Sequence, residues 1–239
     1  MICAQSSAHA CSIVVPVRFP FAQPLVPASA VRNTDDLKQG GTLYRNYLAT
    51  LPGAAAPSII GDGANQYGLY RFRLNSVGVA QGVRTGIFWL PRSSFFLWQA
   101  NFSIVDALSG VGGVTYRLQC GLTTGEFSAL PAAGVGFSYT DTENNGRWLA
   151  WYINGAQIET FDTIADANLT RNAFRIYSPG ATGPFVFLVN DRIVGAVTPQ
   201  AAFSTPLRAS LSAFKIAVAG QRDFTVDYNA TYWARPDIP

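Results

Sequence analysis

The chain has 239 residues, of which 49% are hydrophobic and only 13% are charged, with a formal net charge of +3. This charged fraction is about half of the roughly 25% usual in soluble domains, so we expect much of the surface to be buried in a core or against partners. The Lys and Arg residues form no basic run, which argues against a nucleic-acid partner. No apolar stretch reaches the about 20 residues of a membrane-spanning helix, so no membrane partner is expected.

We expect residues 1–40 to form an extended arm and residues 41–239 to form a single β-sandwich. The arm is rich in proline, a residue that favours an extended path, and holds Pro16, Pro20, Pro24 and Pro27. The run 13–17 is short and no Lys or Arg precedes it, so a secretory signal is not expected. We expect the arm to attach the chain to a neighbouring subunit through apolar contacts. The residues expected to make them are Ile13, Val14, Val15, Val17, Phe19 and Phe21.

Histidine and cysteine are scarce. His9, in the arm, is the only histidine, which argues against a histidine-based catalytic triad and excludes a histidine metal cluster. The three cysteines, Cys3, Cys11 and Cys120, are an odd number and do not form a disulfide framework. Free thiols are expected, although a Cys3–Cys11 bridge stays open. Cys120 falls on the apolar side of its expected strand and should be buried.

Short runs of alternating apolar and polar residues recur along the chain, separated by turn residues. They predict strands over residues 67–74, 85–90, 94–105, 114–120, 135–139, 147–153, 157–161, 173–177, 185–189, 192–197, 211–219 and 224–233. No segment keeps the apolar period of a helix. The predicted fold is therefore all-β, a two-sheet antiparallel jelly-roll sandwich.

The stretch 173–198 is expected to lie at the centre of the fold. Residues 185–189 are apolar on both faces, which is typical of a strand buried on both sides. Asn190-Asp191 can take the positive φ of a tight hairpin turn, and so can Asn154-Gly155. The pattern predicts a central strand pair.

A family resemblance becomes specific at Gly136-Phe137-Ser138-Tyr139 followed by Asn144-Asn145-Gly146-Arg147-Trp148. This segment resembles concanavalin-A-like (laminin-G-like) jelly rolls in virion proteins of tailed bacteriophages. Further runs are similar to that family's strand order, over residues 68–72, 86–89, 160–163, 174–176, 185–194 and 224–228. The resemblance covers residues 41–233, departs from the family at Arg192-Ile193-Val194-Gly195, and leaves the arm outside.

The resemblance implies a non-enzymatic structural protein of a phage particle, assembled in the host cytoplasm. A capsid-decorating (cement) protein held by its arm is favoured, because the chain is short and shows no stalk repeats. The alternative is a tail-fibre or receptor-binding carbohydrate-binding module. The expected partners are other virion subunits, further copies of this chain (a trimer by analogy) and a host glycan.

Paired carboxylates would indicate a glycosidase, and the sequence offers few. Glu126, Glu143 and Glu159 each stand alone. Asp223 and Asp227 share one face of a predicted strand, where we expect outward structural positions. A hydrolase or lyase of the same fold therefore ranks third.

Two groups are candidate binding residues. Trp148 and Trp151 lie on opposite faces of one predicted strand, so one should pack in the core, while the other either contacts a subunit or stacks on a sugar. Asp141, Glu143 and Asn145 carry the oxygen atoms that calcium prefers, in a segment that is also an ordinary solvated turn. No cofactor is expected, with calcium as the alternative.

Overall fold

The structure is a computed structural model, and it describes residues 30–35, 49–50, 58–60, 69–78, 80–84, 96–124, 131–169, 171–179, 183–218 and 220–234. Structural statements below concern these residues. Several expectations lie outside them: His9, Cys3, Cys11, Glu126, the strand at 85–90, and the attachment residues Ile13, Val14, Val15, Val17, Phe19 and Phe21.

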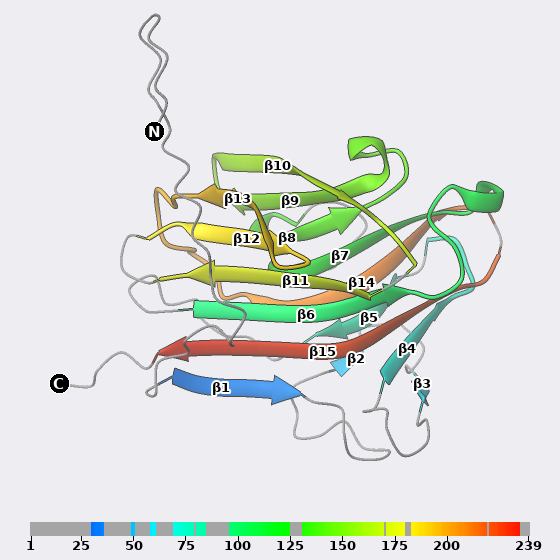
Figure 1. Ribbon diagram of the computed structural model, residues 1–239, viewed down its shortest axis with the longest axis horizontal. Coiled ribbons are helices and arrows are strands. Elements are labelled where there is room, and N and C mark those ends of the chain that lie inside the picture. The colour runs from blue at the N-terminus through cyan, green and yellow to red at the C-terminus, as the bar shows by residue number, and fades with distance from the viewer. Residues whose placement is uncertain are drawn as a thin grey trace, which may run out of the picture.

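Two antiparallel sheets are stacked face to face (Figure 1), and the described residues contain no α-helix. Sheet A runs in the order β13 (Arg192–Val197), β12 (Phe185–Val189), β11 (Arg171–Ser178), β6 (Phe96–Ile104), β15 (Arg222–Ala234), β4 (Leu69–Leu74) and β3 (Ser58–Ile60), and β1 (Ala30–Asp35) pairs with the second half of β15. Sheet B runs in the order β10 (Gln157–Asp166), β9 (Arg147–Asn154), β8 (Ala133–Tyr139), β7 (Thr115–Thr123), β14 (Arg208–Ala217), β5 (Ala80–Arg84) and β2 (Ala49–Thr50). Two short 3-10 turns, η2 (Val111–Gly113) and η3 (Asn144–Gly146), lie in the connections.

The predicted all-β, two-sheet antiparallel jelly roll is confirmed. Alternation along each strand puts one side chain in two into the core between the sheets, as in β7, where Tyr116, Leu118 and Cys120 are buried there. Aromatic rings join the two sheets, with Trp148 of β9 4.5 Å from Phe174 of β11 between ring centroids. The free thiol of Cys120 lies in this core, as predicted.

Strands β12 and β13 do form the predicted hairpin, but the predicted central position of this strand pair is wrong. Asn190 and Asp191 do take positive φ, 49° and 64°, but β13 is the edge strand of sheet A. The core face of β13 closes onto the edge of sheet B, where a Cβ on Gly195 would lie 2.8 Å from Cγ of Phe161. The pattern of apolar residues shows that a strand is buried, but it does not show whether the strand lies at the centre or at the edge of its sheet.

Backbone details shift other expectations. The tight turn between β9 and β10 consists of Gly155 and Ala156, one residue later than predicted, because Asn154 pairs with Gln157. Strand β1 lies within the predicted arm, residues 1–40, and pairs with β15. Strand β5 was not predicted, because its sequence has little apolar alternation.

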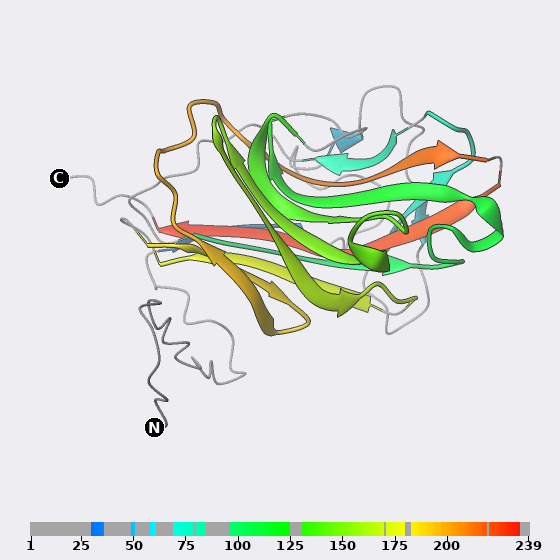
Figure 2. The same ribbon diagram turned by 90° about the horizontal axis from the view of Figure 1, so that it is seen from above.

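The two sheets differ in shape. Figure 2 shows the strands of sheet B strongly bent, whereas β6, β11 and β15 of sheet A run nearly straight. Among the described residues, no helix has the length and apolar character needed to cross a lipid bilayer.

Candidate functional site

The outer face of sheet B carries a band of mostly small polar side chains, here named the polar row. Its members alternate with core residues on four adjacent strands, and they are Gln119 and Thr123 of β7, Ser138 of β8, Trp151 of β9, and Ser210 and Ser212 of β14. Strand pairing brings them together. Ser212 pairs with Gln119, and Gln119 pairs with Ser138. In the next line, Gly136 lies opposite Trp151.

The polar row faces away from the core, yet its side chains are at most 2% exposed. Thr123 and Ser210 hydrogen-bond each other at 3.3 Å between their hydroxyl oxygens. In contrast, the Ser138 hydroxyl, the Ser212 hydroxyl and the Trp151 indole N–H find no hydrogen-bond partner among the described residues. A buried polar group without a partner costs about 1–3 kcal/mol, so three on one face are a feature to explain.

A glycine places the indole of Trp151. A Cβ on Gly136 would lie 2.6 Å from Cζ2 of Trp151, so any other residue would push the ring away. The ring therefore lies close against the backbone of β8. At one end, sheet B carries an ion pair between Arg117 of β7 and Glu143 of the β8–β9 turn.

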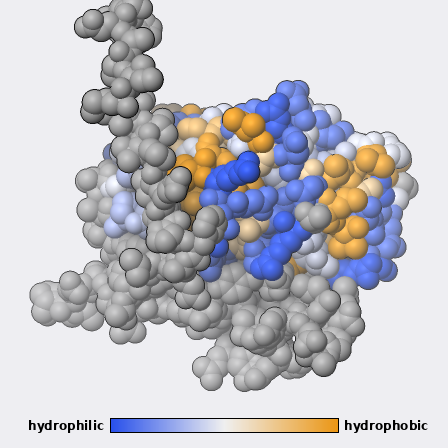
Figure 3. Space-filling view, in the orientation of Figure 1, coloured by the Kyte–Doolittle hydropathy of each residue, from blue (hydrophilic) through white to orange (hydrophobic). Residues whose placement is uncertain are grey.

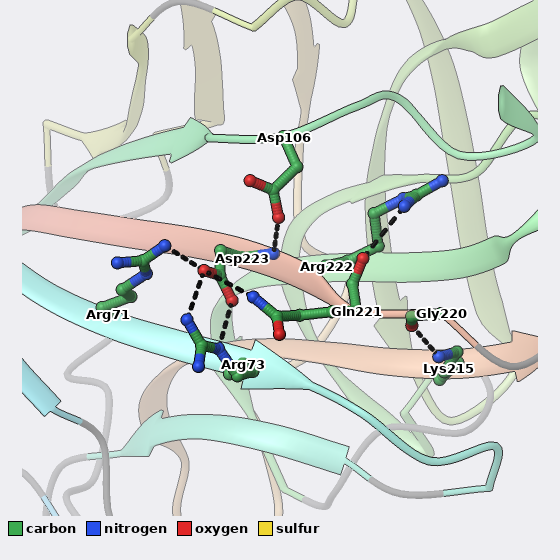
Figure 4. Close-up of polar contacts among 8 residues, drawn as sticks. All are labelled: Arg71, Arg73, Asp106, Lys215, Gly220, Gln221, Arg222 and Asp223. Atoms are coloured by element: carbon green, nitrogen blue, oxygen red, sulfur yellow. Dashed lines mark hydrogen bonds and ion pairs between the residues drawn. The ribbon is translucent and has the colours of Figure 1, made fainter. Parts of the chain in front are cut away.

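A second polar cluster lies on the outer face of sheet A (Figure 4). The Asp223 carboxylate on β15 is fully buried. Arg73 of β4 donates to both of its oxygens, from Nε at 2.9 Å and from a terminal nitrogen at 3.0 Å, and Arg71 donates to Oδ2. The backbone N–H of Asp223 donates to Asp106 at 2.8 Å.

Both oxygens of the buried carboxylate in this second cluster accept hydrogen bonds from arginine side chains. Burial by itself raises the pKa of Asp223, but the hydrogen bonds from Arg73 and Arg71 outweigh it, and the pKa is held below its ordinary value. The same contact raises the pKa of Arg73. A carboxylate so fully bound stabilises the sheet and is not free to act as an acid or base.

The backbone of β15 is irregular between Asp223 and Asp227. The register of β15 against β6 shifts between Val226 and Tyr228, so a bulge at Asp227 interrupts the alternation from which a shared face was predicted.

Both candidate tryptophans are buried. Trp148 is in the core as one of the two was expected to be, packed against Phe174 and Tyr139. Trp151 faces outward but is 0% exposed. A ring stacks on a sugar only if the sugar can reach the face of the ring. The core position of Trp148 rules it out for this role, and Trp151 is then the candidate tryptophan that lies on an outer face.

The candidate calcium residues are engaged elsewhere. Asp141 accepts from the hydroxyls of Ser109 at 2.6 Å and Thr140 at 3.1 Å, and Glu143 is ion-paired with Arg117. Asn145 has a φ of 54° inside η3. Across the described ranges, no group of three or more His, Cys, Asp or Glu side chains is placed to hold a metal ion.

Sequence reasoning missed Ser138, Ser210 and Ser212 of the polar row. A signal was present, because the side of each strand opposite the core carries Gly, Ser and Thr: Gly121 and Thr123 on β7, Gly134, Gly136 and Ser138 on β8, and Ser210 and Ser212 on β14. A face open to water usually carries charged side chains all along its strands. Here they stand only at the ends, at Arg117 of β7 and Arg208 of β14, so the uncharged middle indicates a covered or ligand-bearing face.

No protein-family model and no curated protein matches the chain. Solved structures do share its fold. A protein of unknown function from Shewanella oneidensis MR-1 aligns with a TM-score of 0.59 at 13% identity, over 89% of this chain and 92% of its own. The carbohydrate recognition domain of Emp46p aligns with a TM-score of 0.56 at 11% identity, over 82% and 94%. The Crh5 transglycosylase aligns with a TM-score of 0.55 at 12% identity, over 90% and 88%.

These similarities establish a concanavalin-A-like jelly-roll fold. They also correct the expectation of a non-enzymatic protein, because the similar structures include enzymes. Besides Crh5, the alginate lyase AlyC3 aligns with a TM-score of 0.52 at 12% identity, over 70% of this chain and 75% of its own. At such identities the likeness concerns the fold alone, and the fold does not exclude catalysis.

Proposed function

We propose that this chain recognises a carbohydrate through the outer face of sheet B, with the polar row as the contact surface. The observation that carries the proposal is the set of three buried polar groups without a partner among the described residues. They belong to Ser138, Trp151 and Ser212, all on the outer face of sheet B. The carbohydrate recognition domain of Emp46p, which has the same fold, agrees with this choice of ligand class.

The chemistry of the polar row suits a sugar. A sugar hydroxyl both donates and accepts, so it can bind a serine hydroxyl in either direction and can accept from the Trp151 indole N–H. Serine has a short side chain and glycine has none, so neither would hold a sugar ring away from the sheet. The gain is largest where the protein groups have no other partner, because binding then removes a standing cost of about 1–3 kcal/mol for each group.

The burial of the polar row has a consequence for binding. Because its side chains are at most 2% exposed, a ligand must displace the atoms that now cover them. Part of the intrinsic affinity is used in that step, so the observed affinity is lower than the contacts alone would give.

The test is a glycan array followed by calorimetric titration of the best glycan. The Ser138→Ala/Ser212→Ala double variant should weaken binding about tenfold or more, since two hydrogen bonds contribute about 0.5–1.5 kcal/mol each. The matched control is Ser103→Ala, which removes a half-buried serine of β6 on the outer face of sheet A and should leave the affinity unchanged.

Two results would overturn the proposal. One is an array without reproducible hits. The other is a glycan whose affinity is the same for the wild type, the double variant and Ser103→Ala, because the ligand would then bind away from the polar row.

We further propose that this recognition takes place on a bacteriophage particle, as a tail-fibre or receptor-binding domain. Support comes from the sequence resemblance at residues 136–148. The second candidate is a capsid-decorating protein, favoured by the proline-rich segment 1–40. Gold-labelled antibodies against residues 41–239 distinguish the two on particles in the electron microscope, by labelling tails or heads. Particles without label would overturn both placements.

A further inference from the structure

One end of the sandwich exposes a cluster of aliphatic side chains, here named the valine end. The turns that connect β4 to β5, β6 to β7 and β14 to β15 meet there (Figure 1). The cluster consists of Val77, Val105, Val111, Ile216 and Val218, with exposed fractions of 50%, 43%, 54%, 38% and 52%. Figure 3 shows hydrophobic surface at the corresponding end of the molecule. These five are more than half of the large exposed hydrophobic residues that the structure describes.

Hydrogen bonds join the three turns into one surface. The N–H of Gly78 donates to the carbonyl of Lys215 at 2.9 Å, and Lys215 Nζ donates to the carbonyls of Asn75, at 3.2 Å, and Gly220. Arg222 donates to the carbonyl of Val111 at 2.6 Å. Because these contacts already hold the turns together, docking at the valine end orders little further backbone and costs little entropy.

The backbone at Val218 is strained. Its φ is +59°, a conformation that a β-branched residue rarely adopts and that costs about 1–3 kcal/mol. The side chain it presents is half exposed and contributes little to the core. A strained residue that displays an apolar side chain to solvent indicates a role outside the fold itself.

Charges of both signs lie beside the aliphatic cluster. Arg222 donates only to backbone carbonyls, of Val111 and Gln221, and makes no ion pair within the described residues. Asp106 is exposed, accepts the N–H of Asp223 through one oxygen, and likewise has no ion-pair partner in the described part of the chain. Of the other charged groups nearby, Arg73 is ion-paired with Asp223, and Asp141 accepts a hydrogen bond from the hydroxyl of Ser109. Lys215 is buried and donates to backbone carbonyls.

We propose that the valine end binds the valine end of a second copy of this chain about a two-fold axis. The aliphatic clusters pack on each other, and Arg222 of each copy pairs with Asp106 of the other. A two-fold contact brings each surface against its own copy. A surface with an accessible cation, Arg222, and an accessible anion, Asp106, beside an apolar centre is therefore complementary to itself.

The charges and the size of the patch favour a second copy over other occupants. An anionic lipid surface or a nucleic acid would be attracted by Arg222 but repelled by Asp106 beside it. Five partly exposed aliphatic side chains present on the order of 300 Å², which is below the roughly 800 Å² per partner of a standard interface. The contact should therefore be weak in solution and hold firmly only where many copies are arranged together.

Sedimentation velocity over a wide concentration range tests the pairing. The wild type should show a reversible monomer–dimer equilibrium. Val111→Asp should weaken it at least tenfold, because it places a charge in the apolar centre. The control is Ile158→Asp, a 64% exposed isoleucine on the edge strand β10, which should leave the equilibrium unchanged.

A double-mutant cycle tests the charge pairing. Asp106→Asn keeps an acceptor for the N–H of Asp223, and Arg222→Gln keeps a donor for the carbonyl of Val111. Each should weaken dimerisation several-fold, and the two together should cost less than the sum of the single effects. Additive effects would overturn the pairing of these two residues.

Three outcomes would overturn the proposal as a whole. The first is a monomer at every concentration. The second is a dimer that Ile158→Asp breaks and Val111→Asp does not. The third is a trimer, because three copies cannot meet through one two-fold contact.

Discussion

The outer faces of the two sheets carry two contrasting sets of buried polar groups, the Asp223 carboxylate on sheet A and the serine hydroxyls of the polar row on sheet B. On sheet A, the Asp223 carboxylate is fully buried and receives hydrogen bonds from Arg71 and Arg73. On sheet B, the hydroxyls of Ser138 and Ser212 are equally buried and find no partner among the described residues. The buried carboxylate of sheet A is thus satisfied within the chain, whereas these two hydroxyls of sheet B are not.

The shared core does not demand this difference. Both sheets fill the space between them with the same kinds of side chain, as in the contact between the rings of Phe137 of sheet B and Phe187 of sheet A, 5.7 Å apart. Since the core is common to both faces, the contrast belongs to their outward residues. A face that retains unpaired polar groups is the one expected to receive a ligand.

The largest effect should come from removing the compensated charge. Asp223→Ala leaves the guanidinium groups of Arg71 and Arg73 without their shared carboxylate and should lower the free energy of unfolding by about 3 kcal/mol, as breaking a buried ion pair does. Chemical denaturation followed by tryptophan fluorescence measures it.

The control is the more exposed ion pair on the same face. Arg175 and Asp191 are each about one-third exposed, so Arg175→Gln should cost less than about 1 kcal/mol. An Asp223→Ala variant no less stable than Arg175→Gln would show that the buried carboxylate is not what stabilises sheet A.

The next effect is on the pH dependence of stability. The pKa of Asp223 is lower in the folded chain than the about 3.9 of an unfolded chain, so in acid the unfolded state binds more protons. The stabilisation is present above that unfolded value and is lost as the pH falls towards the folded pKa. Thermal melts between about pH 6 and pH 3 should therefore show a steeper loss for the wild type than for Asp223→Asn.

Asp162 provides a comparison on sheet B. Its pKa is also lowered, chiefly by the hydrogen bond from the backbone N–H of Ile164, but its side chain is 43% exposed. Asp162→Asn should therefore reduce the loss of thermal stability at acid pH by less than Asp223→Asn does. Equal slopes for the wild type and Asp223→Asn would contradict the pKa shift.

The fold could be predicted from the sequence where alternation is strong. Strand β7 alternates apolar and polar residues, and it lies where predicted with its apolar side in the core. The position of a strand within its sheet could not be predicted. The apolar sequences of β12 and β13 indicate burial, but they do not tell whether neighbouring strands or the opposite sheet cause it. Strand β5 was missed because Gly82 and Gln81 give no periodic signal.

The candidate site was less predictable than the fold. Gln119 lies on the polar, outward side of β7, but its burial depends on tertiary packing and not on its own strand. The role of Asp223 was also hidden, since Arg71 and Arg73 are about 150 positions away in the sequence. Pairs so distant become visible only when β4 and β15 are known to be neighbours.

The smallest expected effect concerns the polar row. Here the substitutions should not lower the free energy of unfolding, in contrast to those at Asp223. Ser138→Ala and Ser212→Ala each remove a buried hydroxyl that has no described partner, so each should leave the free energy of unfolding unchanged or raise it by up to about 1 kcal/mol. A serine that hydrogen-bonds within the fold would instead lose stability on the same change. Thermal and chemical denaturation of the two single variants, measured without any glycan, show directly whether stability rises or falls.

If stability falls by more than about 1 kcal/mol, the hydroxyls are satisfied within the chain and the contrast between the sheets disappears. If stability holds while glycan binding weakens, the two serines serve recognition at no benefit to folding, which is the pattern expected of a binding surface.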